Sequence, residues 1–225
     1  MVAMTAPDGA ILDIDLDVLA TNYRLLCARH RGAVAGVVKS DAYGLGATRV
    51  APRLLAEGCR HFFVAHLAEA LALRPLLPGA MLAVLNTMLP GAEAEYAAQG
   101  ILPVLGSLDE VSRWRGMAAR LGHSLPALLH VDTGLNRLGL DGGELARLAA
   151  DHSRLDGIAL RYVMTHLVSS ELPEDPLNRR QLTRFAAARA MLPAAPASLA
   201  NSSGMFLGPE FGSDLARPGA ALYGI

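Results

Sequence analysis

The chain has 225 residues, a formal net charge of -1 and 52% hydrophobic residues. This length suits one large domain or two small ones, and the hydrophobic content is ample for a core. Its arginines are scattered, which argues against a nucleic-acid surface, and no apolar run approaches the ~20 residues of a membrane span. The amino terminus lacks the features of a secretory signal. We therefore expect a cytoplasmic protein that acts on small molecules, without nucleic-acid or membrane partners.

Short apolar segments alternate with longer helical stretches, which is typical of βα units and a parallel sheet. The first segment, Ala10 to Asp15, is predicted as a half-exposed strand, followed by a helix from Val18 to about His30 that Asp17 caps. The barrel strands are predicted after it, at Ala33 to Lys39, His61 to Ala65, Met81 to Leu85, Ile101 to Leu105, Ala127 to Val131, Ile158 to Met164, Ala197 to Ala200 and Ala220 to Tyr223.

Helical segments separate these strands. They are predicted at about Thr48 to Glu57, at Leu67 to Leu73, from near Pro90, after Ser107, after Gly143 to about Asp151 and from about Asp175 to Leu192. Ser107 is a predicted N-cap, with Glu110 placed for a capping box. Together the segments predict an α/β fold, a (β/α)8 TIM-type barrel over residues 33–225 that ends at its eighth strand, with residues 1–32 leading into it.

In such barrels the active site lies where the strands end at their carboxyl side. This rule selects Lys39 and Tyr43, Asn86, Asp132 to Arg137, Thr165 and His166, Asn201 and Ser202, and the segment Arg217 to Ala220. Lys39 is the only lysine among the 20 lysine and arginine residues. An amine can lose its proton and act as a nucleophile, whereas a guanidinium stays charged. No metal site is predicted, because Cys27 and Cys59 lack a ligand-type spacing and are expected to be buried thiols.

Two later segments have the composition of a phosphate site. Asn201 to Gly204 offers hydroxyls and backbone donors, and Arg217 to Ala220 adds a guanidinium and a glycine. Ordinary turn chemistry explains the first segment equally well when it is taken alone. A phosphate site opposite a strand-end lysine, however, predicts pyridoxal 5'-phosphate held through Lys39.

Five motifs resemble those of the alanine racemase family, fold-type III pyridoxal-phosphate enzymes, in the family's order and over most of the chain. Val37 to Gly46 (VVKSDAYGLG) resembles the cofactor-lysine segment. The others are His130 to Gly139, Thr165-His166, Asn201-Ser202 and Arg217 to Gly224, which resemble the Asp-Thr-Gly segment, the strand-six histidine and the phosphate and pyridine segments.

The resemblance implies roles for individual residues. Lys39 would form the Schiff base and act as one of two acid/base groups at the substrate α-carbon. Arg217 would face the pyridine nitrogen with His166 behind it, and Arg137 would reach the cofactor's phenolic oxygen and the substrate carboxylate. The phosphate would be held by Tyr43, Ser202, Gly219 and Ala220, and the remaining cofactor-site residues would be Asn201 and Leu85, with Asn136 nearby. His166 can also be a structural histidine, and Asp132 is expected to serve its turn.

The sequence departs from the family pattern in two respects. Many relatives have a carboxylated lysine at the place of His130, so Arg137 is expected to be oriented by His130 or by a bound anion. Relatives also continue into a β-domain that carries the second acid/base, a tyrosine, across a homodimer interface. We therefore expect these residues to be the barrel portion of a larger homodimeric enzyme, which alone binds cofactor but racemises poorly.

The expected function is that of an isomerase that interconverts L- and D-alanine and so supplies D-alanine as a peptidoglycan precursor. Three alternatives stay open at this point. One is a racemase for serine or another amino acid, and another is a non-catalytic single-domain barrel for pyridoxal-phosphate homeostasis. The third is a metabolite-binding barrel without a cofactor.

Overall fold

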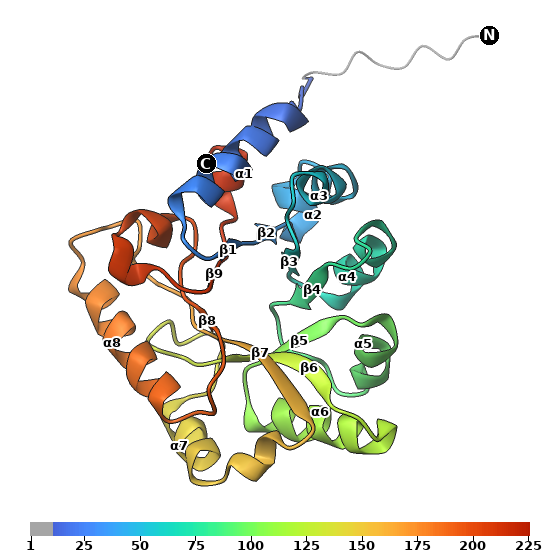
Figure 1. Ribbon diagram of the computed structural model, residues 1–225, viewed down its shortest axis with the longest axis vertical. Helices are drawn as coiled ribbons and strands as arrows, with labels where there is room; N and C mark the ends of the chain where they lie inside the picture. Colours follow the sequence, from blue (N-terminus) through green and yellow to red (C-terminus); the bar gives the residue numbers. More distant parts are fainter. Residues whose placement is uncertain (1–10) are drawn as a thin grey trace.

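The computed structural model describes residues 11–225 as a ring of parallel strands surrounded by helices (Figure 1). The strands are β1 (Ala33–Val34), β2 (Gly36–Val37), β3 (His61–Val64), β4 (Met81–Val84), β5 (Leu102–Leu105), β6 (Leu125–His130), β7 (Ile158–Met164), β8 (Ala197–Ser198) and β9 (Leu215–Ala216). The helices are α1 (Leu16–Arg29), α2 (Lys39–Tyr43), α3 (Ala47–Ala56), α4 (Leu67–Leu73), α5 (Glu93–Gln99), α6 (Leu108–Leu121), α7 (Gly142–Ala150) and α8 (Pro176–Ala190). Five short 3-10 turns complete the fold: η1 (Arg74–Leu76), η2 (His152–Leu155), η3 (Ser203–Phe206), η4 (Pro209–Phe211) and η5 (Ala220–Tyr223).

The strands close into a barrel. Those from β2 to β8 pair in chain order, all parallel, and β1 pairs in parallel with β9. Only Ala35 separates β1 from β2, and its N–H donates to the carbonyl of Ala216 at 2.9 Å. Arg217 N–H donates to the Ala200 carbonyl at 2.8 Å and so joins β9 to the end of β8. The predicted (β/α)8 barrel is therefore confirmed.

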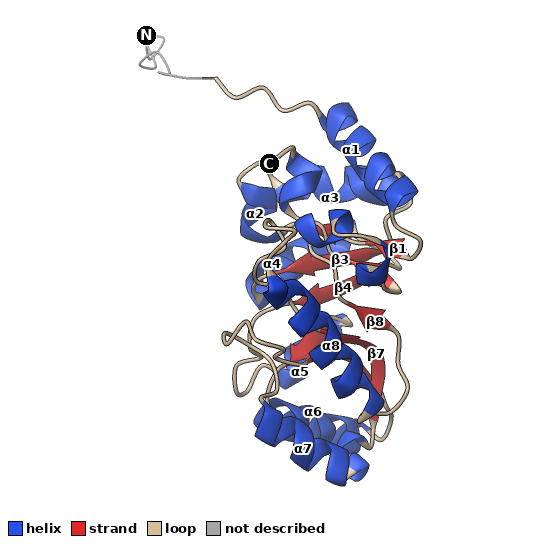
Figure 2. Ribbon diagram, turned by 90° about the vertical axis from the view of Figure 1, so that its left-hand side faces the viewer, coloured by secondary structure: helices blue, strands red, loops and turns tan. Residues whose placement is uncertain are grey.

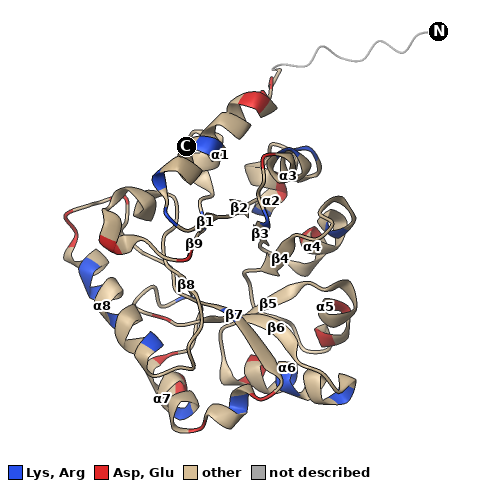
Figure 3. Ribbon diagram, viewed as in Figure 1, with Lys and Arg blue, Asp and Glu red and all other residues tan. Residues whose placement is uncertain are grey.

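Apolar side chains fill the ring from inside and cover it from outside. Inside, the strands contribute buried residues that include Val37, Phe63, Ala83, Val104, Leu128 and Met164. A larger cluster lies between the strands and the outer helices, where Trp114 meets Tyr96 edge to face at 6.4 Å. Figure 2 shows the helices outside the strands, and Figure 3 shows that the charged residues belong mainly to these helices and their loops. Among residues 11–225, no helix is long and apolar enough to cross a membrane.

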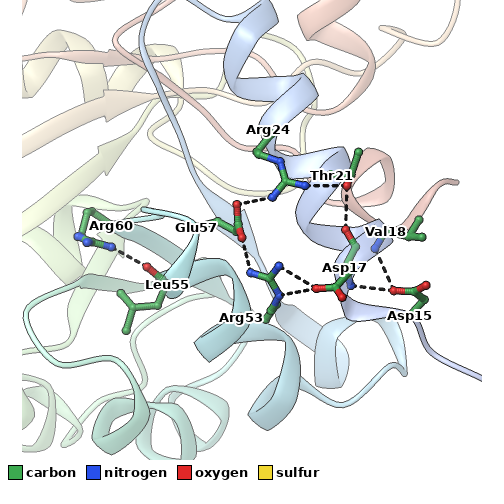
Figure 4. A network of polar contacts seen from close by, with 9 residues as sticks. All are labelled: Asp15, Asp17, Val18, Thr21, Arg24, Arg53, Leu55, Glu57 and Arg60. Carbon is green, nitrogen blue, oxygen red and sulfur yellow. Dashed lines mark hydrogen bonds and ion pairs between the residues drawn. The ribbon is translucent and has the colours of Figure 1, made fainter.

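Helix α1 lies beside α3 and is tied to it by charges (Figure 4). Arg53 donates to Asp17 at 2.9 Å and also pairs with Glu57, which accepts from Arg24 at 2.6 Å. Ion pairs that are open to solvent contribute little to stability, because water screens the charges. Burial of apolar residues on the inner face of α1 therefore holds the helix, and the charges set its direction.

Most predicted elements are confirmed to within a few residues, but the amino-terminal strand is wrong. Residues 11–15 form no regular structure, and Ala10 lies outside the described residues. The cap of α1 is Asp15 rather than Asp17, because its Oδ1 accepts from the N–H groups of Asp17 and Val18 at 2.8 and 3.1 Å. The alternating acidic residues therefore belong to a helix start.

The predicted eighth strand at Ala220 to Tyr223 is also wrong. These residues form η5, where Leu222 N–H donates to the Gly219 carbonyl at 2.9 Å. A run of four apolar residues cannot by itself distinguish a strand from a buried turn. The last strand is β9, which ends one residue before Arg217. Arg217 thus follows a strand, as the barrel rule requires of a site residue, instead of preceding one.

Two smaller predictions have mixed outcomes. Ser107 does cap α6, and its Oγ accepts from Glu110 N–H at 3.2 Å. The Glu110 carboxylate, however, accepts from Gly106 N–H and Met88 N–H instead of from Ser107 N–H. Both cysteines are free thiols, with Cys59 buried as expected and Cys27 only partly so.

Candidate active site

The barrel brings most of the predicted site residues to the carboxyl ends of its strands. Lys39 follows β2, Leu85 follows β4 and His166 follows β7. Asn201 and Ser202 follow β8, Arg217 follows β9, and Arg137 lies in the segment between β6 and α7. Leu85 packs against the inner cluster of the barrel.

Lys39 is followed by a turn with left-handed backbone conformation. Residues 40–43 have φ values between +53° and +58°, and none of them is glycine. They form one left-handed helical turn, in which Ala42 N–H donates to the Val38 carbonyl and Gly44 N–H to the Ser40 carbonyl, both at 2.9 Å. Each such residue costs about 1–2 kcal/mol relative to the right-handed form. Contacts from outside the turn must therefore hold it.

Such contacts lie at both ends of the turn. Ser40 N–H donates to Glu69 Oε1 at 2.6 Å, and Ala47 N–H donates to Asp41 Oδ1 at 2.6 Å. The Lys39 Nζ lies 6.0 Å from the centre of the Tyr43 ring. The turn thus fixes Lys39 and Tyr43 relative to each other, although neither is fully buried.

The Tyr43 side chain of this turn reaches a second group of residues, Ser202 and Gly219, near the carboxyl ends of β8 and β9. Ser202 Oγ accepts from the N–H groups of Gly219 and Ala221 at 3.0 and 3.1 Å, across Ala220. A Cβ atom on Gly219 would lie 2.1 Å from Tyr43 Oη, so only glycine fits there. Burial raises the pKa of Tyr43, which keeps its hydroxyl protonated and able to donate. This place therefore combines two hydroxyls with backbone N–H groups, a donor set that suits an anion.

Asn201 serves its own loop. Its Oδ1 accepts from Gly204 N–H and from Ser170 Oγ, both at 2.9 Å. The side chain thereby shapes the loop that carries Ser202.

Arg217 is a buried cation that has no carboxylate among its hydrogen-bond partners in the described residues 11–225. It is 4% exposed and donates to Ser198 Oγ and, at 2.6 Å, to the Thr165 carbonyl. Burial lowers its pKa to about 10, so it is still charged at neutral pH. Because both acceptors are uncharged, the positive charge stays available to a ligand.

Two histidines near Arg217 are neutral at pH 7. Burial, followed by the charges of Arg217 and Arg137, lowers the pKa of His166 to about 3. The pKa of His130 falls to about 4, with burial as the largest cause and Arg217 second. His130 is 5% exposed, and its Nε2 is buried without a hydrogen-bond partner among residues 11–225. No hydrogen bond joins His166 to Arg217 in the described part of the chain, so they interact through charge.

Asp132 serves its turn, as predicted. Its Oδ1 accepts from the N–H groups of Gly134 and Leu135 at 2.9 Å and of Asn136 at 3.1 Å. Asn136 itself has a φ of +55°, and the Arg137 side chain is exposed. The turn thus occupies the Asp132 carboxylate, and Arg137 has no hydrogen-bond partner among residues 11–225.

Three contributors were missed by the sequence reasoning: Ser198, Glu69 and Gln181. Ser198 holds Arg217, and Glu69 holds the turn after Lys39. Gln181, which is buried, donates to the His166 carbonyl at 2.9 Å and accepts from Val168 N–H at 2.9 Å. Only Glu69 has a sequence signal, because it is the third residue of the predicted helix, where a glutamate can complete a capping box.

Comparisons with known proteins show the family of this chain. Residues 14–225 match the model of the family described as "Alanine racemase, N-terminal domain". An alanine racemase of Acidiphilium cryptum is 58% identical over 213 residues, which cover 95% of this chain and 59% of the relative. One of Brucella abortus is 52% identical over 219 residues, covering 96% and 55%. The chain thus spans a little over half the length of these relatives.

The fold of this chain is also similar to solved structures of racemases. An alanine racemase from Bartonella henselae with covalently bound pyridoxal phosphate superposes with a TM-score of 0.92 at 40% identity, covering 94% of this chain and 62% of that one. A histidine racemase from Leuconostoc mesenteroides has a TM-score of 0.86 at 24% identity, covering 98% and 61%. At that identity the second likeness concerns the fold alone.

Proposed function

This chain belongs to the alanine racemase family as its N-terminal domain, and from this premise we propose that it is the pyridoxal-phosphate barrel of a racemase that interconverts L- and D-alanine. One observation carries the proposal. The only lysine follows a barrel strand on a fixed turn, and the tyrosine of that turn reaches the anion cradle at Ser202 and Gly219. A lysine amine next to an anion site suits a cofactor that carries both an aldehyde and a phosphate.

The residues present fit this cofactor. At the cradle, Ser202 Oγ accepts from the N–H groups of Gly219 and Ala221, which leaves its own hydroxyl proton to donate to a phosphate. Arg217 is a buried cation whose hydrogen-bond acceptors are uncharged. When bound, pyridoxal phosphate withdraws electrons from the substrate and so makes its α-proton removable. Lys39 would be the covalent anchor, and Tyr43, Ser202 and the N–H groups of Gly219 and Ala220 would bind the phosphate.

Other residues would orient the ring and the substrate. Arg217 would face the ring nitrogen, where its fixed charge disfavours protonation. Leu85 would line the site, and Asn201 would hold the Ser202 loop. Arg137, the exposed cation at the mouth, would bind the substrate carboxylate. His166 is neutral and can therefore accept or donate one hydrogen bond without adding to the positive charge.

Racemisation needs a proton-transfer group on each face of the α-carbon, and Lys39 supplies one. The tyrosines of residues 11–225 are engaged elsewhere. Tyr23 Oη donates to the Val34 carbonyl, Tyr223 Oη to the Val37 carbonyl, and Tyr162 Oη lies 3.1 Å from His61 Nε2. Tyr96 packs against Trp114, and Tyr43 points at Gly219. The proposal therefore assigns the opposite face to a group outside the described residues.

The proposed substrate and the proposed role in the cell are inferred from the relatives. The 58% identical relative bears the name alanine racemase, which favours alanine, whereas the histidine racemase shows that the fold does not fix the substrate. We assign the chain to D-alanine supply for peptidoglycan in the cytoplasm, as part of a homodimer and without nucleic-acid or membrane partners. Residues 33–225 would be the cofactor-binding unit, with residues 1–32 leading into it.

The test is borohydride trapping. The protein is incubated with pyridoxal phosphate, reduced, digested and mapped by mass spectrometry, and we expect a pyridoxyl adduct on Lys39. The variant Lys39→Arg should lose it. In the control Arg49→Lys, the new lysine lies at an exposed position of α3 and should be labelled far less than Lys39. An unlabelled Lys39 in the wild type would contradict the proposal.

A second measurement separates a racemase from a non-catalytic carrier. Alanine is incubated with the protein and cofactor in heavy water, and deuterium at the α-carbon is measured by mass spectrometry. A proton-transferring Lys39 requires deuterium uptake that disappears in Lys39→Arg. Trapping without any uptake would favour the carrier.

A further inference from the structure

Three glutamates occupy the same place on three helices of the barrel. Glu69, Glu110 and Glu144 are each the third residue of their helix, α4, α6 and α7. In each case Oε2 accepts from an N–H group of the turn that starts the helix. These donors are Ala65 and His66 at 2.7 and 3.0 Å for Glu69, Gly106 at 2.7 Å for Glu110 and Asp141 at 3.4 Å for Glu144.

The second oxygen of each glutamate reaches back to an earlier βα unit. Glu110 Oε1 accepts from Met88 N–H at 2.6 Å, and Glu144 Oε1 accepts from Leu108 N–H at 3.0 Å. Glu69 Oε1 accepts from Ser40 N–H at 2.6 Å. Each carboxylate thus joins two consecutive turns at the mouth of the barrel.

Glu69 differs from the other two in what it holds. Its distant donor, Ser40, is the first residue of the left-handed turn and the neighbour of Lys39. Met88 lies in an ordinary loop and Leu108 begins a right-handed helix, so Glu110 and Glu144 hold backbone without this strain. We propose that Glu69 is a positioning residue that sets the direction of Lys39 toward the cofactor, an inference that rests on the proposed function.

The physical reason lies in the composition of the turn. Residues 40–43 contain no glycine, so each has a side chain that disfavours a positive φ. A hydrogen bond from Ser40 N–H to a carboxylate is charge-assisted and so stronger than one to a neutral acceptor. The same carboxylate is fixed to the end of β3 through Ala65. Glu69 therefore ties the turn to the sheet, and without it Lys39 would lose its defined direction.

The test compares Glu69→Gln with Glu144→Gln, a change at the same helical position away from Lys39. A glutamine has one acceptor oxygen, so it cannot serve both turns, and its amide would face an N–H group. We expect Glu69→Gln to raise the apparent Kd for pyridoxal phosphate about 10-fold, measured by absorbance titration. Glu144→Gln should leave it within about twofold. Equal Kd values for the two variants would overturn the proposal.

Amide exchange gives a readout that needs no cofactor. In the cofactor-free protein we expect Glu69→Gln to raise the exchange rate of the Ser40 amide about 10-fold by NMR. Glu144→Gln should leave that amide unchanged. If the wild type forms no adduct on Lys39, the proposed function fails while this measurement still tests the hold of Glu69 on the turn. An unchanged Ser40 amide in Glu69→Gln would overturn that hold.

A rescue experiment separates positioning from general support of α4. Glycine adopts a positive φ without strain, so Ser40→Gly should restore the turn where Glu69 is missing. The double variant Ser40→Gly with Glu69→Gln is expected to recover a Kd within about threefold of the wild type. Absence of rescue would overturn the proposal. If Glu69→Gln does not fold, Glu69→Asp, which keeps the charge but shortens the reach, takes its place under the same criteria.

Discussion

Two sets of ionisable side chains surround the mouth of the barrel, and they differ in how their hydrogen bonds are satisfied. The carboxylate set consists of Glu69, Glu110 and Glu144, and the oxygens of each accept backbone N–H groups from two turns. The cationic set consists of the arginines Arg137 and Arg217 together with His130 and His166, which are neutral at pH 7. In this set Arg217 donates only to uncharged oxygens, and His130 Nε2 has no hydrogen-bond partner in the described part of the chain.

The difference separates scaffold from binding site. A buried charge that is fully hydrogen-bonded by the protein's own backbone has nothing left to offer a ligand. A group of cations whose neighbours are neutral produces a positive potential that favours an anion. Accordingly, changes in the carboxylate set should act mainly on stability, with Glu69 as the exception, and changes around the cationic set should act on binding.

The largest expected effect on stability comes from Glu110, which is 2% exposed. Replacing it with alanine leaves the N–H groups of Met88 and Gly106 without their acceptor, and we expect a loss of about 3 kcal/mol in the free energy of unfolding. Urea unfolding followed by circular dichroism measures it. The exposed helix residue Glu95, changed to alanine, should cost no more than about 0.5 kcal/mol.

The affinity of Glu110→Ala for the cofactor tests whether the carboxylate set and the cationic set act separately. Folded Glu110→Ala should bind pyridoxal phosphate within about threefold of the wild type, because Glu110 contacts neither Lys39 nor the cradle. If cofactor affinity fell with stability, the two sets would not be separable.

Gly219→Ala, unlike Glu110→Ala, should weaken the binding of pyridoxal phosphate. The new Cβ would lie 2.1 Å from Tyr43 Oη, so the tyrosine must leave the cradle. We expect a loss of about 2 kcal/mol in unfolding free energy and at least about 10-fold weaker binding of pyridoxal phosphate. Gly142→Ala is the matched control, because nothing lies within 4 Å of its Cβ position. Unchanged cofactor affinity in Gly219→Ala would remove Tyr43 from the cradle.

The sequence predicts the barrel well because its signal is local. Strand and helix segments repeat with a clear period, and β7 and α4 fall at their predicted bounds. The eighth strand fails for a non-local reason. Residues 220–223 are apolar like a strand, but Ser202 Oγ holds the N–H groups of Gly219 and Ala221 and folds the segment into η5.

The sequence predicts which residues form the site, but it does not predict the contacts that hold these residues in place. The strand-end rule selects Lys39, His166 and the segment that begins at Arg217, and the motif resemblance adds their expected roles. The left-handed turn is not visible in the sequence, because residues 40–43 contain no glycine that would indicate a positive φ. Ser198 is equally hidden, since its bond to Arg217 joins residues 19 apart in the chain.

The smallest expected effect concerns His130 and pH. In the folded protein its pKa is about 4, and in the unfolded chain it is near 6.5. Between these values the unfolded state binds more protons, so acidification from pH 6.5 to 4 lowers the free energy of unfolding, and a pH above 6.5 adds nothing. One such group contributes at most about 1.4 kcal/mol per pH unit.

His130→Gln should therefore reduce the slope of unfolding free energy against pH by about 1 kcal/mol per unit in this window, whatever its effect on stability at pH 7. Urea unfolding at several pH values measures the slope. His123→Gln, at an exposed position, should leave the slope unchanged. An unchanged slope in His130→Gln would mean that folding does not lower the pKa of His130. His130 would then take up a proton below about pH 6.5 in the folded protein and add a charge next to Arg217.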